Sequence, residues 1–196
     1  VAVTEGDKVE VQAKLGWQVN TWPVGTLVET MNAVTDVEID ELMNLYRATY
    51  DFATDDLETV RYQAREEIAM KKMLDAEGCK AFSNTFQDLY GMKQLPGLAS
   101  QHLMALGYGY GGEGDWKTAA MVRIMKIMTE GMKDAKGTSM LEDYTYNFVP
   151  GKEGILQAHM LEVCPTIADG PVSIRVNPLS MGDREDPARL VFEAKE

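Results

Sequence analysis

The spacing of apolar residues changes near residue 136, and this change limits the folds open to the chain more than any other feature. Before it, apolar residues recur every three or four positions in segments separated by short strand candidates, a pattern typical of a parallel α/β sheet. After it, polar and apolar residues alternate in three segments, 139–149, 155–164 and 189–194. The sequence predicts an α/β fold in which a Rossmann-like parallel α/β layer is followed by an antiparallel, barrel-like β region.

Two domains are expected from this division. Residues 1–134 are predicted to form part of an α/β central domain, and residues 135–196 the start of an antiparallel β domain. Within the second part, the turn sequence PGKEG separates two alternating runs and predicts a β-hairpin. Within the first part, the alternating residues 17–22 predict a short strand.

Composition and charge exclude several classes of protein. The 196 residues include 45% hydrophobic and 26% charged residues, as in soluble globular proteins. A net charge of −12 would repel a phosphate backbone, so we expect no nucleic-acid partner. The sequence shows no signal peptide and no apolar run long enough to span a membrane. Cys79 and Cys164 lack metal-binding spacing, which favours a reducing cytoplasm.

The glycine run GYGYGGEG contains Gly107, Gly109 and Gly112, which match the GxGxxG spacing of dinucleotide-binding loops. That fingerprint requires a strand before the first glycine, whereas the preceding LASQHLMAL is typical of a helix. Glu113 would also place a negative charge where the pyrophosphate docks. The pattern therefore disfavours a phosphate loop. Glu113 is placed either to meet a cation or a sugar hydroxyl, or to cap a helix, and this segment alone leaves both open.

Two further polar side chains stand in apolar company in the predicted hairpin. Glu142 and His159 each share an alternating face with apolar residues, where an unpaired carboxylate is costly to bury. Taken singly, His159 fits a hydrogen-bonded core residue and Glu142 a residue at the rim. Taken with Glu113, they form a set of oxygen and imidazole donors that suits Mn²⁺, Mg²⁺ or Co²⁺.

The hairpin register tests this metal hypothesis. If the numbers of opposed residues add to an odd number, as when Tyr144 faces His159, then Glu142 and His159 are diagonal neighbours on one face. An even number places them on opposite faces. The metal hypothesis predicts the odd register unless a bulge intervenes, and a separation above about 10 Å would contradict it.

A stripe of methionines runs along the segment that follows the glycines. We expect it to lie in the core or at a subunit contact. Its members are Met121, Met125, Met128 and Met132.

Five segments together carry a resemblance to a known family: NTFQDLYGMKQLPGLA, GYGYGGEGDWKTAAMVRIMKIM, LEDYTYNF, AHMLEVCP and DPARLVF. They resemble bacterial L-arabinose isomerase, and the likeness runs from Val1 to Glu196. It covers a central part of that family's chain, without the N-terminal domain and the distal C-terminal segment. We therefore expect this chain to be a piece of something longer.

The resemblance implies roles for particular residues. It makes Glu113 and Glu142 the paired metal-binding and acid/base carboxylates, and His159 the first of two histidine ligands. The second ligand falls beyond residue 196, and His102 lies in a helix where the family has no ligand. The sugar pocket is implied to be lined by Phe86, Met160 and Met181.

The resemblance also implies a reaction, cofactors and partners. The expected activity is that of a metal-dependent aldose–ketose isomerase that converts L-arabinose to L-ribulose, and D-galactose to D-tagatose, through a cis-enediol. Mn²⁺, with Co²⁺ or Mg²⁺ possible, is the expected cofactor, the sugar is the expected partner, and a trimer or hexamer is the expected assembly. Without the second histidine, this chain alone is expected to bind metal weakly and to be inactive. An L-fucose-type isomerase and a catalytically incomplete sugar- or metal-binding fragment are the alternatives.

Overall fold

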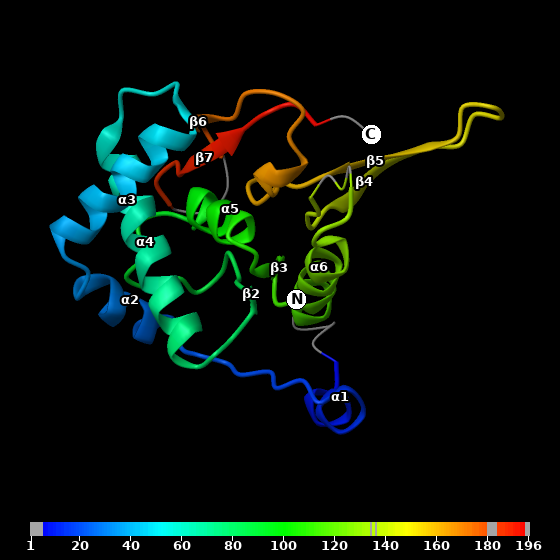
Figure 1. Cartoon of the computed structure of the whole chain (residues 1–196), viewed down its shortest axis with the longest axis horizontal. Coiled ribbons are helices and arrows are strands. Elements are labelled where there is room, and N and C mark those ends of the chain that lie inside the picture. The colour runs from blue at the N-terminus through cyan, green and yellow to red at the C-terminus, as the bar shows by residue number, and fades with distance from the viewer. Residues whose placement is uncertain (1–5, 134, 136, 180–183, 195–196) are drawn as a thin grey trace.

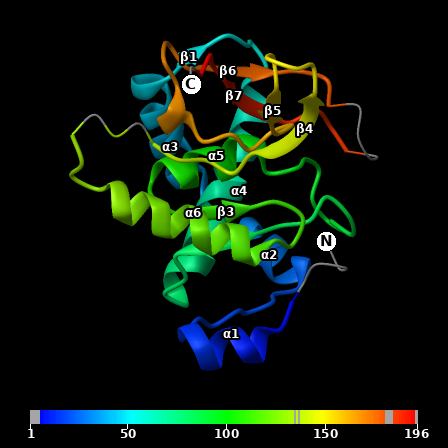
Figure 2. The same ribbon diagram turned by 90° about the vertical axis from the view of Figure 1, so that its right-hand side faces the viewer.

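A computed structural model describes residues 6–133, 135, 137–179 and 184–194 of the chain (Figures 1 and 2). Within these residues the helices are α1 (Lys8–Leu15), α2 (Val24–Asn32), α3 (Asp36–Thr49), α4 (Leu57–Ala76), α5 (Gly97–Ala105), α6 (Trp116–Thr129) and the short 3-10 helix η2 (Pro165–Ile167). The strands are β1 (Asp51–Phe52), β2 (Ala81–Ser83), β3 (Gly109–Gly111), β4 (Glu142–Asn147), β5 (Gly154–Ala158), β6 (Ser173–Val176) and β7 (Ala188–Val191).

Side-chain caps fix where four of the helices begin. Asp7, Asp56 and Asp115 each accept a hydrogen bond from the backbone N–H three residues later. Before α3, Thr35 and Glu38 cap each other reciprocally, which satisfies two of the free N–H groups at the helix start. These caps are local, so the sequence alone places these helix starts well.

Helix α5 lies at the centre of the molecule, and eight of its nine residues are buried. One face of it packs on α4, and another packs on β7 and η2. In Figure 1, α2, α3 and α4 stand together on one side of α5, and β6 and β7 lie above it. The largest core cluster joins Met43 and Tyr46 of α3 to Ile174 of β6 and Leu190 of β7. The core therefore crosses the division predicted near residue 134, and the two-domain organisation stays a prediction.

The sheets are small and of mixed type. β1 pairs with β6 in parallel, and β6 pairs with β7 antiparallel. β2 and β3 form a separate parallel pair. The mixed α/β class is thus confirmed, whereas the Rossmann-like arrangement stays a prediction.

The predicted barrel-like region is wrong for the described residues, which form no closed barrel. The antiparallel strands separate into two places, because β6 and β7 join β1 while β4 and β5 pair only with each other. In Figure 1 the β4–β5 hairpin extends away from the rest of the chain. Alternation of polar and apolar residues predicts a strand, but it does not say which strand lies beside it.

The strand predicted at residues 17–22 is also wrong, since these residues have no regular secondary structure. Trp22 instead packs against the cluster of Met70 and Leu74 on α4. The alternation in this segment therefore did not indicate a strand, and the segment is attached to the core through Trp22.

The glycines of β3 allow α6 to lie directly on the strand. A Cβ atom at Gly109 would stand 2.0 Å from the carbonyl oxygen of Ala119, and one at Gly111 would stand 2.2 Å from that of Asp115. Only glycine fits at such distances, so the run serves close packing of helix on strand. The face of α6 that meets β3 carries the buried residues Ala119 and Val122.

The methionine stripe lies away from this contact. Met121, Met125, Met128 and Met132 are 42% to 65% exposed, so the expectation that they belong to the core is wrong within this chain. The other expectation, a subunit contact, stays a prediction. In the described part of the chain, no helix is both long and apolar enough to cross a membrane.

Candidate active site

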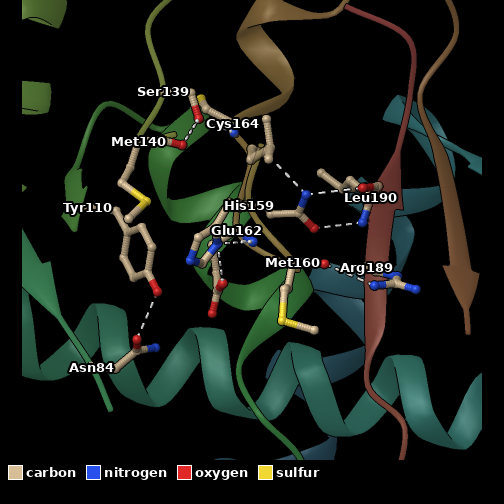
Figure 3. Close-up of polar contacts among 12 residues, drawn as sticks. Asn84, Tyr110, Ser139, Met140, His159, Met160, Glu162, Cys164, Arg189 and Leu190 are labelled. Atoms are coloured by element: carbon tan, nitrogen blue, oxygen red, sulfur yellow. Dashed lines mark hydrogen bonds and ion pairs between the residues drawn. The ribbon is translucent and has the colours of Figure 1, made fainter. Parts of the chain in front are cut away.

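Four of the predicted site residues, Phe86, Glu113, His159 and Met160, line a small cavity of about 50 Å³, and Glu142 is not among its lining residues. It is lined by residues of segments 84–86, 95–96, 110–113 and 159–162, together with Leu179. Figure 3 shows Asn84, Tyr110, His159 and Glu162 in this region. A larger and more open hollow of about 510 Å³ lies beside β1. We assign the site to the smaller cavity because it brings carboxylates and an imidazole together.

Glu113 stands in the turn between β3 and α6, and it lines the cavity. Its φ of 57° falls in the left-handed region, which residues other than glycine rarely occupy. Behind it, the Gly114 N–H donates a 2.8 Å hydrogen bond to the Ser83 hydroxyl, and Asp115 caps α6. The turn is therefore held directly after Glu113, and it keeps a strained glutamate at the cavity wall.

His159 follows directly after β5 and is held on one side by Glu162. The two side chains form an ion pair at 2.9 Å between His159 Nδ1 and Glu162 Oε2. The other ring nitrogen, Nε2, lies 3.3 Å from the position that a Cβ on Gly112 would occupy. The imidazole thus points its Nε2 at the turn that carries Glu113.

Negative charge from three carboxylates acts on this imidazole. Burial by itself lowers the pKa of His159, but the hydrogen bond and charge of Glu162, with the charges of Glu142 and Glu113, raise the pKa above its usual value. The pKa of the Tyr110 hydroxyl is raised by burial first, and then by Glu162, Glu113 and Glu142. The three carboxylates therefore surround one histidine and one tyrosine.

Glu142 opens β4 and pairs with Ala158 in the even register. The register shifts at a bulge between Asp143 and Thr145, and beyond it the pairs are odd, beginning with Thr145 opposite Leu156. The odd register was expected unless a bulge intervened, and a bulge does intervene: Tyr144 falls at it, and His159 lies past the end of β5. The bulge bends β4, and His159 lies outside β5. The register alone therefore does not decide whether the Glu142 and His159 side chains lie on the same face of the hairpin.

The remaining predicted residues are distributed as follows. Phe86 and Met160 line the cavity and are partly exposed. Met181 lies outside the described residues. His102 is buried in α5, with its Nδ1 2.6 Å from Glu67 Oε1, and does not line the cavity.

A divalent metal ion is implied by the resemblance. The types of donor atom present suit such an ion, but their spacing does not. Glu113, Glu142 and His159 are oxygen and imidazole donors of the kind that suits Mn²⁺. Yet in the described part of the chain no group of three His, Cys, Asp or Glu side chains is close enough to hold an ion. The cavity is also well below the roughly 300 to 1,000 Å³ of ligand pockets. An ion bound here must draw these side chains together or take a further donor.

Three polar residues of the site escaped the sequence analysis. The Tyr110 hydroxyl donates a 2.9 Å hydrogen bond to Asn84 Oδ1, while the Asn84 amide nitrogen is buried without a partner. Glu162 is 6% exposed and contacts His159. Only Glu162 had a detectable sequence signal, since it stands three residues after His159 in the same apolar segment.

Comparisons with known proteins identify the family of this chain. Residues 1–131 match the family model described as the L-arabinose isomerase central domain, and residues 137–196 match the L-arabinose isomerase C-terminal domain. The two matches are to successive domain models of one protein family. The chain belongs to the L-arabinose isomerase family.

Curated relatives are similar over the whole chain. It is 55% identical over 195 residues to L-arabinose isomerase 1 of Bacillus licheniformis, covering 98% of this chain and 39% of the relative. It is 56% identical to L-arabinose isomerase of Shouchella clausii and 54% identical to that of Thermotoga petrophila, in each case covering 100% of this chain and 40% of the relative. The chain thus spans about 40% of the length of the curated relatives it matches.

Proposed function

We propose that the protein to which this chain belongs is a metal-dependent aldose–ketose isomerase that converts L-arabinose to L-ribulose, and D-galactose to D-tagatose. One observation carries this proposal: Glu113, from the turn between β3 and α6, and His159, which follows β5, line the same cavity. Membership of the L-arabinose isomerase family supports it. The expected setting is the cytoplasm, with a homo-oligomer of three or six copies.

Interconversion of an aldose and a ketose moves a proton between C2 and C1 through a cis-enediol. This requires a base on one carbon and an acid for the other. Glu113 and Glu142 are assigned these roles, and they exchange them between the forward and reverse directions. The strained turn holds Glu113 at the cavity wall, which favours proton transfer because it fixes the position of the carboxylate.

Glu113, Glu142 and His159 are the residues that would hold the ion, with Mn²⁺ preferred and Co²⁺ or Mg²⁺ possible. When bound, a divalent ion supplies positive charge to the sugar oxygens. Phe86 and Met160 offer apolar contacts to the sugar carbons and exclude water from the proton transfer.

A second candidate function is a sugar- or metal-binding fragment without turnover. The absence of a three-donor group in the described residues and the small cavity favour it for this chain alone. The two candidates differ in whether the donors missing here are supplied by the rest of the protein.

Glutamine substitutions test the proposal on the protein expressed from its natural gene. Glu113→Gln and Glu142→Gln each remove a proton acceptor at nearly constant shape, so we expect ketose formation from L-arabinose to fall at least 10²-fold, with an unchanged circular dichroism spectrum. Glu29→Gln, at an exposed position of α2, is the matched control and should retain full activity. Turnover retained in either site variant refutes the acid/base assignment. Faster turnover of L-fucose than of L-arabinose by the unchanged protein favours the L-fucose-type alternative.

A further inference from the structure

Glu162 is a buried carboxylate that no step of the proposed reaction uses. It is 6% exposed, and its Oε2 lies 2.9 Å from His159 Nδ1. A carboxylate is rarely buried unless its oxygens are hydrogen-bonded, so the contact with His159 explains why Glu162 is tolerated there.

A neutral His159 ring has two tautomers, and the contacts of Nδ1 decide between them. With the proton on Nδ1, the ring donates to the Glu162 carboxylate at 2.9 Å. With the proton on Nε2, Nδ1 accepts from the Glu162 backbone N–H at 3.3 Å, but its lone pair then faces the carboxylate oxygen. The first arrangement gives a short hydrogen bond to a charged acceptor, which is about twice as strong as one between neutral groups. The second arrangement keeps the long 3.3 Å bond from the Glu162 backbone N–H, which the first gives up, but it sets the Nδ1 lone pair against the charged carboxylate oxygen. The Nδ1–H form is therefore favoured.

The Nδ1–H tautomer leaves the lone pair of Nε2 free. That nitrogen lies 3.3 Å from where a Cβ on Gly112 would stand, beside the turn that carries Glu113. Histidines that bind metal ions in proteins commonly donate their other ring N–H to a carboxylate, which fixes both the tautomer and the ring orientation. The contacts of His159 have this arrangement before any ion is present.

We infer that Glu162 is a positioning residue that holds His159 in the Nδ1–H tautomer, with Nε2 presented to the Gly112–Glu113 turn as a ligand for a divalent cation. The inference about the cation rests on the proposed function. The tautomer itself depends only on the contacts between these two side chains, and it is measured without any metal.

The tautomer is measured by nitrogen NMR on protein labelled with ¹⁵N-histidine, at a pH where the ring is neutral. The two ring nitrogens have different chemical shifts according to which of them carries the proton. The His159 signals are assigned by their loss in His159→Gln. In the unchanged protein we expect the proton on Nδ1. A proton on Nε2 in the unchanged protein overturns the inference, whatever the variants do.

Glu162→Gln tests the role of the carboxylate. The glutamine side chain can turn its NH₂ group toward Nδ1, so we expect the proton of His159 to move to Nε2 and the Nε2–H population to rise. A merely structural role for Glu162 would leave the tautomer unchanged. Glu29→Gln is the matched control, and the signals of His102, which is paired with Glu67, serve as an internal reference in every sample.

Titration calorimetry with Mn²⁺ separates this inference from the proposed function. We expect Glu162→Gln to bind Mn²⁺ about 10 to 100-fold more weakly than the unchanged protein. If the tautomer shifts but even the unchanged protein binds no Mn²⁺, the proposed function fails and the positioning of His159 stands. If the unchanged protein binds Mn²⁺ and Glu162→Gln alters neither the tautomer nor the affinity, the positioning role fails and the proposed function stands.

Discussion

At the scale of single residues, Glu113 is the residue whose backbone is least suited to its side chain. It adopts a φ of 57° while glycines stand on both sides of it. A residue with a Cβ atom costs roughly 1 to 2 kcal/mol in this conformation. Strain of this kind persists where the surrounding contacts hold it, and it collects at functional sites. The strained backbone at Glu113 therefore supports the functional role that we propose for this residue.

This strain gives a prediction about stability. Glu113→Gly removes the strain but loses about 0.5 to 1 kcal/mol through the greater entropy of glycine in the unfolded chain. Glu113→Gln removes the same charge and keeps the strain. We expect Glu113→Gly to be the more stable of the two by about 0.5 to 1 kcal/mol, measured by chemical denaturation. Equal stability of the two variants would show that the backbone at this residue is relaxed.

The sequence allowed a candidate site to be predicted only through residues that can be singled out one by one. Glu113, Glu142 and His159 stood out as polar side chains in apolar company, and Phe86 and Met160 through the family resemblance. Glu162 was not recognised although it stands three residues after His159, and Tyr110 and Asn84 could not be, because their contact joins β3 to the segment after β2. Those segments meet only in the folded chain, and no local pattern reports such a meeting.

At the scale of elements, the glycines of β3 decide how closely α6 approaches. Adding a methyl group at Gly109 would place it 2.0 Å from a backbone oxygen of α6, which cannot move without shifting the helix. A methyl group at Gly154, in β5, would meet nothing within 4 Å. Alanine substitutions at the two positions therefore distinguish the effect of close helix–strand packing on stability from the effect of replacing any strand glycine.

We expect Gly109→Ala to lower the free energy of unfolding by about 1 to 3 kcal/mol or more, because forced overpacking displaces α6. Gly154→Ala should be neutral or slightly stabilising, since alanine loses less entropy on folding than glycine. The midpoints of urea unfolding compare the two directly. Equal destabilisation by both variants would mean that α6 does not pack on β3 through this glycine.

Elements were predictable where their determinants were local. Caps such as Asp7 and Thr35 set the starts of α1 and α3 through contacts with residues three positions along the chain. Strands depend on a partner, so residues 17–22 failed as a strand and the hairpin departed from one register at its bulge. The same reason accounts for the barrel, because alternation in 139–149 and 155–164 did not reveal that this hairpin stands apart from β6 and β7.

At the scale of the whole molecule, a group of buried polar side chains ties the central helices together. The two amide protons of Gln63 on α4 are shared among three acceptors, on Glu66, Gln94 and the Leu95 carbonyl, and the side-chain oxygen of Gln63 accepts from the Ala99 N–H of α5. Such networks favour one arrangement of a core when every member is satisfied. Here one member is not, because Oε1 of Glu66 is buried and has no hydrogen-bond partner among the described residues.

Burial raises the pKa of Glu66 well above the ordinary value of 4.5. The folded protein then keeps a proton that the unfolded chain releases, so the stability of the whole molecule falls as the pH rises above about 4.5. Glu66→Gln mimics the protonated side chain at every pH. We expect it to match the unchanged protein near pH 4 and to become progressively more stable than the unchanged protein as the pH rises toward 8, as measured by denaturant unfolding at a series of pH values.

Glu41→Gln, at an exposed position of α3, should not change the pH dependence in this way. Parallel stability curves for Glu66→Gln and the unchanged protein would show that Glu66 ionises freely, and that water or a rearranged partner reaches this carboxylate in the core.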